Sequence, residues 1–234
     1  LLVAMGLVPA PEFPTLPALL IASYPEHETF APRLGTPVLS TLMGLDTLSA
    51  TNAILVPGAD TRPSLGVVFL HGSAGSFAFQ CLEVAASLRG ADAEVLCPSD
   101  HLEGRWTSLD AQRIVRSSVA LLRARGAERI VLIGLSNGAI GASQIAHRFP
   151  IDGLVLISGV SSRAPSPRVR ALVLQGQADA MVRTSSVRAW VRSHRNVHYV
   201  ELPGTHFVLI EDRERVRRAI RAYCTLSTHR RARS

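Results

Sequence analysis

From residue 67 onwards, short apolar runs alternate with segments that have the composition of helices. The runs cover residues 67–70, 93–97, 130–133, 154–157, 171–174 and 197–202. Short strands that alternate with helices indicate a parallel sheet that is buried on both faces. The alternation therefore predicts an α/β domain, in which helices flank a mostly parallel sheet on both sides.

The clearest helical signal lies over residues 108–125. One face of this segment collects Ala111, Ile114, Val115, Ser118, Val119 and Leu122, and its arginines lie away from that face. Gly126 follows and is expected to end the helix. Further helices are predicted over residues 79–88, 140–149 and 185–194, and from about Asp212 to the end of the domain.

The first 45 residues do not follow this alternation. Four prolines, at positions 9, 11, 14 and 17, interrupt an apolar stretch that lacks the charged start of a secretory signal. We predict an N-terminal apolar, proline-rich arm over residues 1–45 and one domain over residues 46–234, since α/β domains of this length fold as single units. We expect the arm to pack across the sheet or near the mouth of the site, with the remnant of a removed signal or anchor as the alternative.

Charge and hydropathy bear on whether the protein binds nucleic acid or spans a membrane. The formal net charge is +7, and all 25 basic residues other than histidine are arginine. Most of these arginines lie singly on polar helix faces, and only 5% of the residues are aromatic, so we expect no nucleic-acid partner. No apolar run reaches the roughly 18 to 20 residues of a membrane span, so we predict no transmembrane segment.

The three cysteines have neither metal-ligand nor redox spacing. An odd count argues against a disulfide framework, so we expect Cys81, Cys97 and Cys224 to be buried thiols. A single Cys81–Cys97 bridge stays open for an exported protein. Neither the compartment nor the oligomeric state follows from the sequence.

Polar residues follow four of the predicted strands. HGSAG follows residues 67–70, GLSNG follows 130–133, GQAD follows 171–174 and PGTHF follows 197–202. Because ligands bind at the carboxyl ends of the strands in such sheets, we expect these four segments to meet in one site. They bring two serines, an aspartate and two histidines to the same edge.

The segment GLSNG is the most informative of the four. It fits the pattern G-x-S-x-G, in which a serine stands on a sharp strand-to-helix turn called the nucleophile elbow. Such a turn leaves no room for side chains two residues to either side, and Gly134 and Gly138 provide that room. We therefore predict Ser136 as a nucleophile, with the plain glycine-rich turn as the alternative.

A serine hydroxyl needs a base, and the base needs a carboxylate that orients it. Among the eight histidines, His206 follows the last predicted strand, which makes it our candidate base. Asp179 follows the strand over residues 171–174 and is our candidate carboxylate. Asp152 precedes its strand and lies at the wrong edge, and Asp100 is a weaker rival after the strand over residues 93–97.

Acyl transfer also requires donors for an oxyanion. The residue after the nucleophile commonly provides one backbone amide, here that of Asn137. The loop after the first predicted strand provides the other, and we assign it to the amide of Ser73. His71 and Gly72 are expected to structure that loop, because His71 immediately precedes a glycine.

Together these segments resemble the α/β-hydrolase superfamily. The resemblance covers roughly residues 53–224 and rests on VVFLHGSAG, IVLIGLSNGA, LVLQGQAD and ELPGTHF in the family's order. It implies a two-step acyl transfer through an acyl-serine, a small-molecule acyl ester as substrate, and neither cofactor nor metal. Many relatives carry a lid where this chain has only GVSSRAPSPR, so we expect no cap domain and an open site.

The resemblance leaves three functions open. The first is a lidless serine hydrolase that cleaves carboxylic esters or thioesters, with amide or peptide cleavage and lactone opening also open. The second is an acyltransferase on the same scaffold, and the third is a non-catalytic ligand-binding relative. Candidate walls of an acyl pocket are Phe77, Trp106, Leu135, Ile140, Met181, Val182 and Phe207, each with a place in the core as the alternative.

Overall fold

The computed structural model describes residues 15–28, 53–58, 62–73, 77–100 and 104–226. Seven strands form one sheet in the order β1-β3-β2-β4-β5-β6-β7. Their bounds are β1 Ala53–Val56, β2 Leu65–Leu70, β3 Ala93–Pro98, β4 Arg129–Leu135, β5 Gly153–Ile157, β6 Ala171–Gly176 and β7 Val197–Leu202. Neighbouring strands are parallel except for β1, which pairs antiparallel with β3. This arrangement confirms the predicted mostly parallel sheet and adds β1, which the sequence pattern missed.

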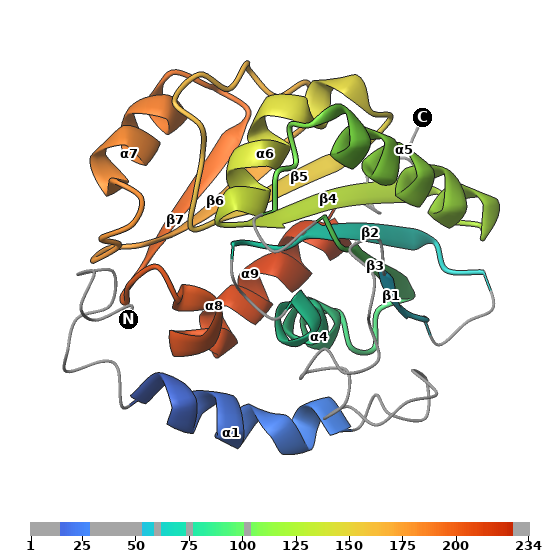
Figure 1. Cartoon of the computed structure of the whole chain (residues 1–234), viewed down its shortest axis with the longest axis horizontal. Coiled ribbons are helices and arrows are strands. Elements are labelled where there is room, and N and C mark those ends of the chain that lie inside the picture. Colours follow the sequence, from blue (N-terminus) through green and yellow to red (C-terminus); the bar gives the residue numbers. More distant parts are fainter. Residues whose placement is uncertain (1–14, 29–52, 59–61, 74–76, 101–103, 227–234) are drawn as a thin grey trace.

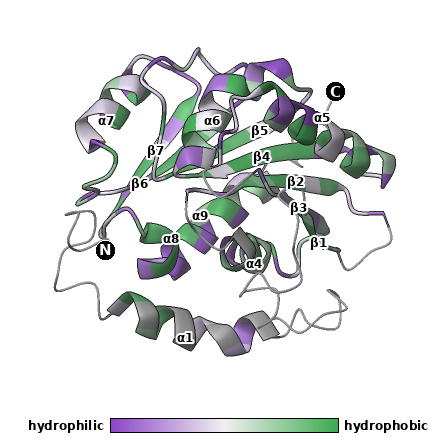
Figure 2. Ribbon diagram, viewed as in Figure 1, coloured by the Kyte–Doolittle hydropathy of each residue, from purple (hydrophilic) through white to green (hydrophobic). Residues whose placement is uncertain are grey.

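Helices cover both faces of the sheet (Figure 1). On one face lie α5 (Leu109–Ala124), α6 (Asn137–Ile145) and α7 (Thr184–Arg192), with a 3₁₀ turn at Ala146–Arg148 after α6. On the other face lie α4 (Phe77–Ser87), α8 (Val208–Glu211) and α9 (Arg213–Leu226). Each face has its own apolar core. The central strands contribute apolar residues to both cores, as their colouring in Figure 2 shows, which is why they appear as continuous apolar runs in the sequence.

Helix α5 shows how local sequence determines an element. Ser108 caps its first turn, where its side chain accepts a hydrogen bond from the Ala111 amide at 3.1 Å. Gly126, with φ +110°, takes the chain out of the helix. Five of the six residues on the predicted apolar face are buried, and Ile114 packs against the same core.

The cysteine prediction is wrong for two of the three residues. Cys81 in α4 and Cys97 in β3 form a disulfide, and Cys224 is a free, buried thiol. We expected three thiols because the number of cysteines is odd. That number says nothing about which cysteines come together when a helix packs on the sheet. The bridge joins β3 to the helix that follows the HGSAG segment.

Part of the predicted arm forms helix α1 (Thr15–Glu28), which lies beneath α4 and α8 in Figure 1. It packs on helices rather than across the sheet. Its Glu26 pairs with Arg213 and Arg217 of α9, and both arginines also pair with the buried Glu83 of α4. The predicted boundary between residues 45 and 46 lies outside the described residues. No helix in the described ranges has the length and hydropathy of a membrane span.

Candidate active site

Three polar side chains meet at the carboxyl edge of the sheet, as their positions after parallel strands predict. Ser136 follows β4, Asp179 follows β6 and His206 follows β7. The His206 Nε2 atom lies 2.8 Å from Ser136 Oγ, and His206 Nδ1 lies 2.8 Å from Asp179 Oδ2. The structure thus joins the three residues into one hydrogen-bonded chain that ends on a hydroxyl.

The turn that carries Ser136 is strained. Ser136 has φ 54° and ψ −119°, a conformation that residues with a side chain rarely adopt. A Cβ on Gly134 would lie 2.4 Å from the Gly138 carbonyl oxygen, and a Cβ on Gly138 would lie 2.0 Å from the Leu70 carbonyl oxygen. The two glycines therefore permit the close approach that the G-x-S-x-G pattern predicts.

Hydrogen bonds decide which ring nitrogen of His206 carries its proton. A carboxylate can only accept, so Nδ1 donates to Asp179 and Nε2 of the neutral ring accepts the Ser136 hydroxyl proton. Both side chains are buried, with 8% of Asp179 and 5% of His206 exposed. The ring is therefore held in the tautomer that a base for Ser136 requires.

The Asp179 carboxylate receives four hydrogen bonds. Oδ1 accepts from the backbone amides of Met181 at 2.9 Å and Val182 at 2.8 Å, while Oδ2 accepts from His206 and from Gln175 Nε2 at 2.6 Å. Burial opposes ionisation, but the hydrogen bonds from His206, Val182 and Gln175 and the charge of His206 outweigh it and lower the pKa of Asp179. The sequence analysis missed Gln175, although a polar residue inside the apolar run ALVLQG was a visible signal.

The segment that carries His206 contacts helix α8 on one side and the end of β6 on the other. Glu211 of α8 accepts hydrogen bonds from the Thr205 amide and from the Thr205 hydroxyl, both at 2.7 Å. On the opposite side, a Cβ on Gly176 would lie 2.0 Å from the Thr205 carbonyl oxygen. Position 206 therefore depends on close contact with the end of β6.

The two segments assigned to the oxyanion donors also lie together. The Asn137 side-chain amide donates to the Ser73 hydroxyl, which joins the first turn of α6 to the loop after β2. A Cβ on Gly72 would lie 2.9 Å from the Cβ of Ser136. The loop after β2 therefore passes directly beside Ser136.

His71 is embedded in the framework of that loop. Its Nε2 accepts from the Asp100 amide at 3.1 Å, so Nδ1 carries the proton and donates to the Gly72 carbonyl at 2.8 Å. Burial lowers the pKa of His71, which keeps the ring neutral despite the charge of Asp100. The Trp106 indole donates to the His71 carbonyl oxygen at 2.9 Å, and the two rings meet edge to face.

Comparison with known proteins bears on the fold. No family model matches the sequence, and no curated protein matches it. A lidless α/β serine hydrolase from Xanthomonas campestris is similar to this chain with a TM-score of 0.58, at 21% identity over 73% of this chain and 86% of that one. An α/β serine hydrolase homologue from Coxiella burnetii gives 0.60, at 15% identity over 73% and 90%. The esterase domain of a Rhodothermus marinus protein gives 0.58, at 18% identity over 73% and 90%.

The chain has the α/β-hydrolase fold. Identities this low establish the shared fold alone. In this α/β-hydrolase fold, β5 and β6 are joined by residues 158–170, which hold no helix or strand. The prediction that no cap domain stands between these strands is therefore confirmed.

The two rival aspartates lie elsewhere in the α/β-hydrolase fold. Asp152 precedes β5 at the amino edge, where Oδ2 accepts from Arg123 and from the Ile130 amide. Asp100 lies beside His71 after β3, and no hydrogen bond joins it to His206 among the described residues. Asp179 is the carboxylate that the structure places against the histidine.

The candidate pocket walls divide into two groups. Trp106 and Leu135 are buried in the core, whereas Met181 is exposed, and Ile140, Val182 and Phe207 are partly exposed. The Phe207 ring lies edge to face with the His206 ring. The side chain of Phe77 lies outside the described residues.

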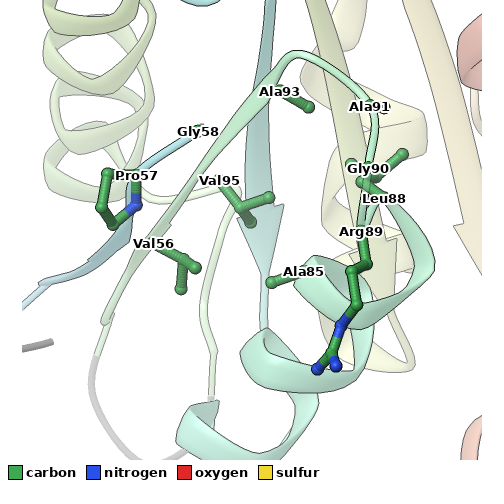
Figure 3. Close-up of a pocket in the computed structure, with 10 residues that line it drawn as sticks. All are labelled: Val56, Pro57, Gly58, Ala85, Leu88, Arg89, Gly90, Ala91, Ala93 and Val95. Atoms are coloured by element: carbon green, nitrogen blue, oxygen red, sulfur yellow. The ribbon is translucent and has the colours of Figure 1, made fainter. Parts of the chain in front are cut away.

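A separate cavity of about 50 Å³ lies between β1, β3 and the end of α4 (Figure 3). None of the four strand-end segments lines it, and its volume suits no more than a small group. Among the described residues, no group of histidine, cysteine and carboxylate side chains could hold a metal ion.

Proposed function

We propose that this protein is a lidless serine hydrolase that cleaves carboxylic esters or thioesters through an acyl-serine intermediate. Ser136 is the nucleophile, His206 the base and Asp179 the residue that orients and charge-balances the base. The observation that carries the proposal is the buried hydrogen-bonded chain from Asp179 through His206 to Ser136, with 2.8 Å at each step.

The first half-reaction would acylate the serine. Ser136 Oγ attacks the carbonyl carbon of the substrate while His206 Nε2 takes the hydroxyl proton. The carbonyl electrons move to the oxygen, and the backbone amides of Ser73 and Asn137 stabilise the resulting oxyanion. When the tetrahedral intermediate collapses, the carbon–oxygen or carbon–sulfur bond breaks and His206 gives its proton to the leaving alcohol or thiol.

The second half-reaction would release the acid. A water molecule attacks the acyl-serine, His206 accepts a proton from it, and the same two amides hold the second oxyanion. The intermediate then collapses, the bond between the acyl carbon and Ser136 Oγ breaks to release the acid, and His206 returns the proton to Oγ. Asp179 stays ionised throughout, in keeping with its lowered pKa, and offsets the charge of the imidazolium in each transition state.

The substrate class is inferred from the lack of a cap domain between β5 and β6 and from nearby apolar side chains. The exposed Met181 lies two residues after Asp179, and the Phe207 ring meets the His206 ring edge to face. Two similar structures are described as α/β serine hydrolases and a third as an esterase domain. These features support small acyl esters as substrates.

The test is hydrolysis of a panel of p-nitrophenyl and thioester substrates of increasing acyl length. The purified protein should turn over at least the short esters, and His206→Ala should lose about 10³-fold or more in kcat with an unchanged melting temperature. Full activity in folded His206→Ala would contradict the proposal. Transfer of the acyl group to an added alcohol in preference to water would instead indicate an acyltransferase.

A further inference from the structure

Gln175 is a polar residue within an otherwise apolar strand. It lies near the end of β6, and its side chain is completely buried. Val173, two residues earlier and therefore on the same side of the strand, belongs to the core beneath α5, α6 and α7. An amide at such a position has to be explained by what it contacts.

The amide contacts the one carboxylate oxygen that holds His206. Gln175 Nε2 donates to Asp179 Oδ2 at 2.6 Å, and the same oxygen accepts from His206 Nδ1 at 2.8 Å. Rotation of the amide by 180° would set Oε1 against the carboxylate, so Asp179 determines which end of the amide faces it. Gln175 therefore acts on Oδ2 through a donor whose orientation is fixed.

The contact with Asp179 leaves the other end of the Gln175 amide without a hydrogen bond to any described residue. Gln175 Oε1 is buried and has no hydrogen-bond partner among the residues that the structure describes. Within the same described part of the chain, Ser158 directly follows β5, its amide donates to the Leu174 carbonyl oxygen, and its buried hydroxyl has no partner either. An apolar side chain of equal size would remove this unpaired carbonyl together with the hydrogen bond to Asp179. These two changes act on stability in opposite directions, so stability alone does not explain the glutamine.

We propose that Gln175 is a positioning residue, whose amide holds Asp179 Oδ2 in line with His206 and shares the negative charge of that oxygen. The inference rests on the proposed function. Attack by Ser136 turns His206 into an imidazolium, whose partner must be ionised and aligned at that moment. The two backbone amides at Oδ1 fix one end of the carboxylate, and the Gln175 amide fixes the end that faces the imidazole.

The proposal predicts a shift in the pH dependence of activity. Without the amide, Oδ2 has one donor fewer and attracts a proton on the Asp179–His206 pair more strongly. The acidic limb of kcat/KM should therefore move to higher pH by about one unit. Other ionisable groups on the elements beside β6 include the ion-paired Glu201 and Arg188, Tyr199 and His198 on β7, and Glu211, which binds Thr205. All of these remain in the variants below.

Three variants test it. Gln175→Met keeps the length and removes both the donor and the unpaired carbonyl, whose effects on stability oppose each other. We therefore expect a melting temperature close to that of wild type, kcat about tenfold lower and the shifted acidic limb. Gln175→Glu can donate only while its carboxyl is protonated, so its activity should approach wild type at low pH and fall as that proton is lost. Gln177→Met makes the same exchange on an exposed side chain two residues away and should leave the pH profile unchanged.

Wild-type kinetics in Gln175→Met, with the acidic limb in its original place, would overturn the proposal. A wild-type protein without esterase activity would instead overturn the proposed function. In that case the His206 Nδ1 proton, followed by NMR against pH in wild type and Gln175→Met, separates the two ideas. A shifted titration in the variant supports the action of the amide on the pair, and coincident titrations refute it.

Discussion

Two aspartates at opposite edges of the sheet show how the same residue type has different roles. Asp152, at the amino edge, accepts from Arg123 at 2.8 Å and from the Ile130 amide at 2.9 Å, and it ties α5 to the starts of β4 and β5. Asp179, at the carboxyl edge, is buried more deeply and begins a hydrogen-bonded chain that continues through His206 to Ser136. Asp152 is paired with a guanidinium that keeps its charge. The hydrogen-bonded chain from Asp179 ends at a hydroxyl that can give up a proton.

The two edges of the sheet also differ in backbone strain. Among the described residues, the non-glycine positions with positive φ are Ser136 and Ser158, and both follow strands at the carboxyl edge. Strained conformations persist only where the surroundings enforce them, and they gather at functional sites. Asp152 at the amino edge therefore holds the sheet through satisfied contacts, whereas the strained non-glycine positions lie at the edge that carries the proposed site.

Exchange of each aspartate for asparagine should separate the two edges most strongly. Asp179→Asn removes the acceptor that fixes the His206 tautomer, so kcat should fall by about 10³- to 10⁴-fold while the protein stays folded. Asp152→Asn should keep wild-type kcat and KM. Steady-state kinetics on one ester measure both, and comparable losses in the two variants would break the comparison.

The disulfide should matter for stability and not for the chemistry. It closes a loop with a sequence separation of 16 residues, so the double variant Cys81→Ala, Cys97→Ala should lose about 3 kcal/mol of unfolding free energy. Urea unfolding measures the loss, and wild-type protein at the same pH is the reference. We expect kcat at 20 °C to stay within a few-fold of wild type, and a loss like that of Asp179→Asn would link the bridge to the site.

The ion pair at the amino edge should have a smaller effect. Asp152 and Arg123 are both partly exposed, so the pair is screened by water, and the Ile130 amide is the more sheltered partner. Asp152→Asn should cost about 1 kcal/mol of unfolding free energy. Thermal unfolding checks this value, with Asp110→Asn, which alters an exposed pair on α5, as a control that should change stability far less.

The smallest expected effect is on the pH dependence of stability. The pKa of Asp179 is lower in the folded protein than its ordinary value, so its ionised form stabilises the fold above about pH 4, and this contribution is lost as the pH falls through the lowered pKa. The difference in unfolding free energy between wild type and Asp179→Asn should therefore shrink on acidification. A difference that stays constant from pH 6 to pH 3 would contradict the lowered pKa.

Local signals in the sequence predicted much of the fold and of the candidate site. Strands β2, β4, β5 and β6 were visible because buried parallel strands are continuous apolar runs, and Ser136 was visible because the turn needs Gly134 and Gly138. His206 and Asp179 followed because parallel strands bring their carboxyl ends to one edge. Their catalytic roles stay a prediction.

The missed features depend on contacts between distant residues or on very short segments. Strand β1 and helix α8 each have four residues, too few to show a period. Helix α1 does not separate an apolar face from a polar one, and it contains Pro25. Both features hid its helical character. The Cys81–Cys97 bridge and the contact of Gln175 with Asp179 arise only once the sheet and its helices have assembled.

The central claim is that Ser136 is an activated nucleophile, and labelling with a fluorophosphonate tests it without any assumption about substrate. The proposal predicts stoichiometric phosphonylation of the folded wild-type protein, with the adduct located on Ser136 by peptide mass spectrometry. Labelling should be absent in Ser136→Ala and strongly slowed in His206→Ala. A folded wild-type protein that stays unlabelled, or an adduct that persists in Ser136→Ala, would contradict the account.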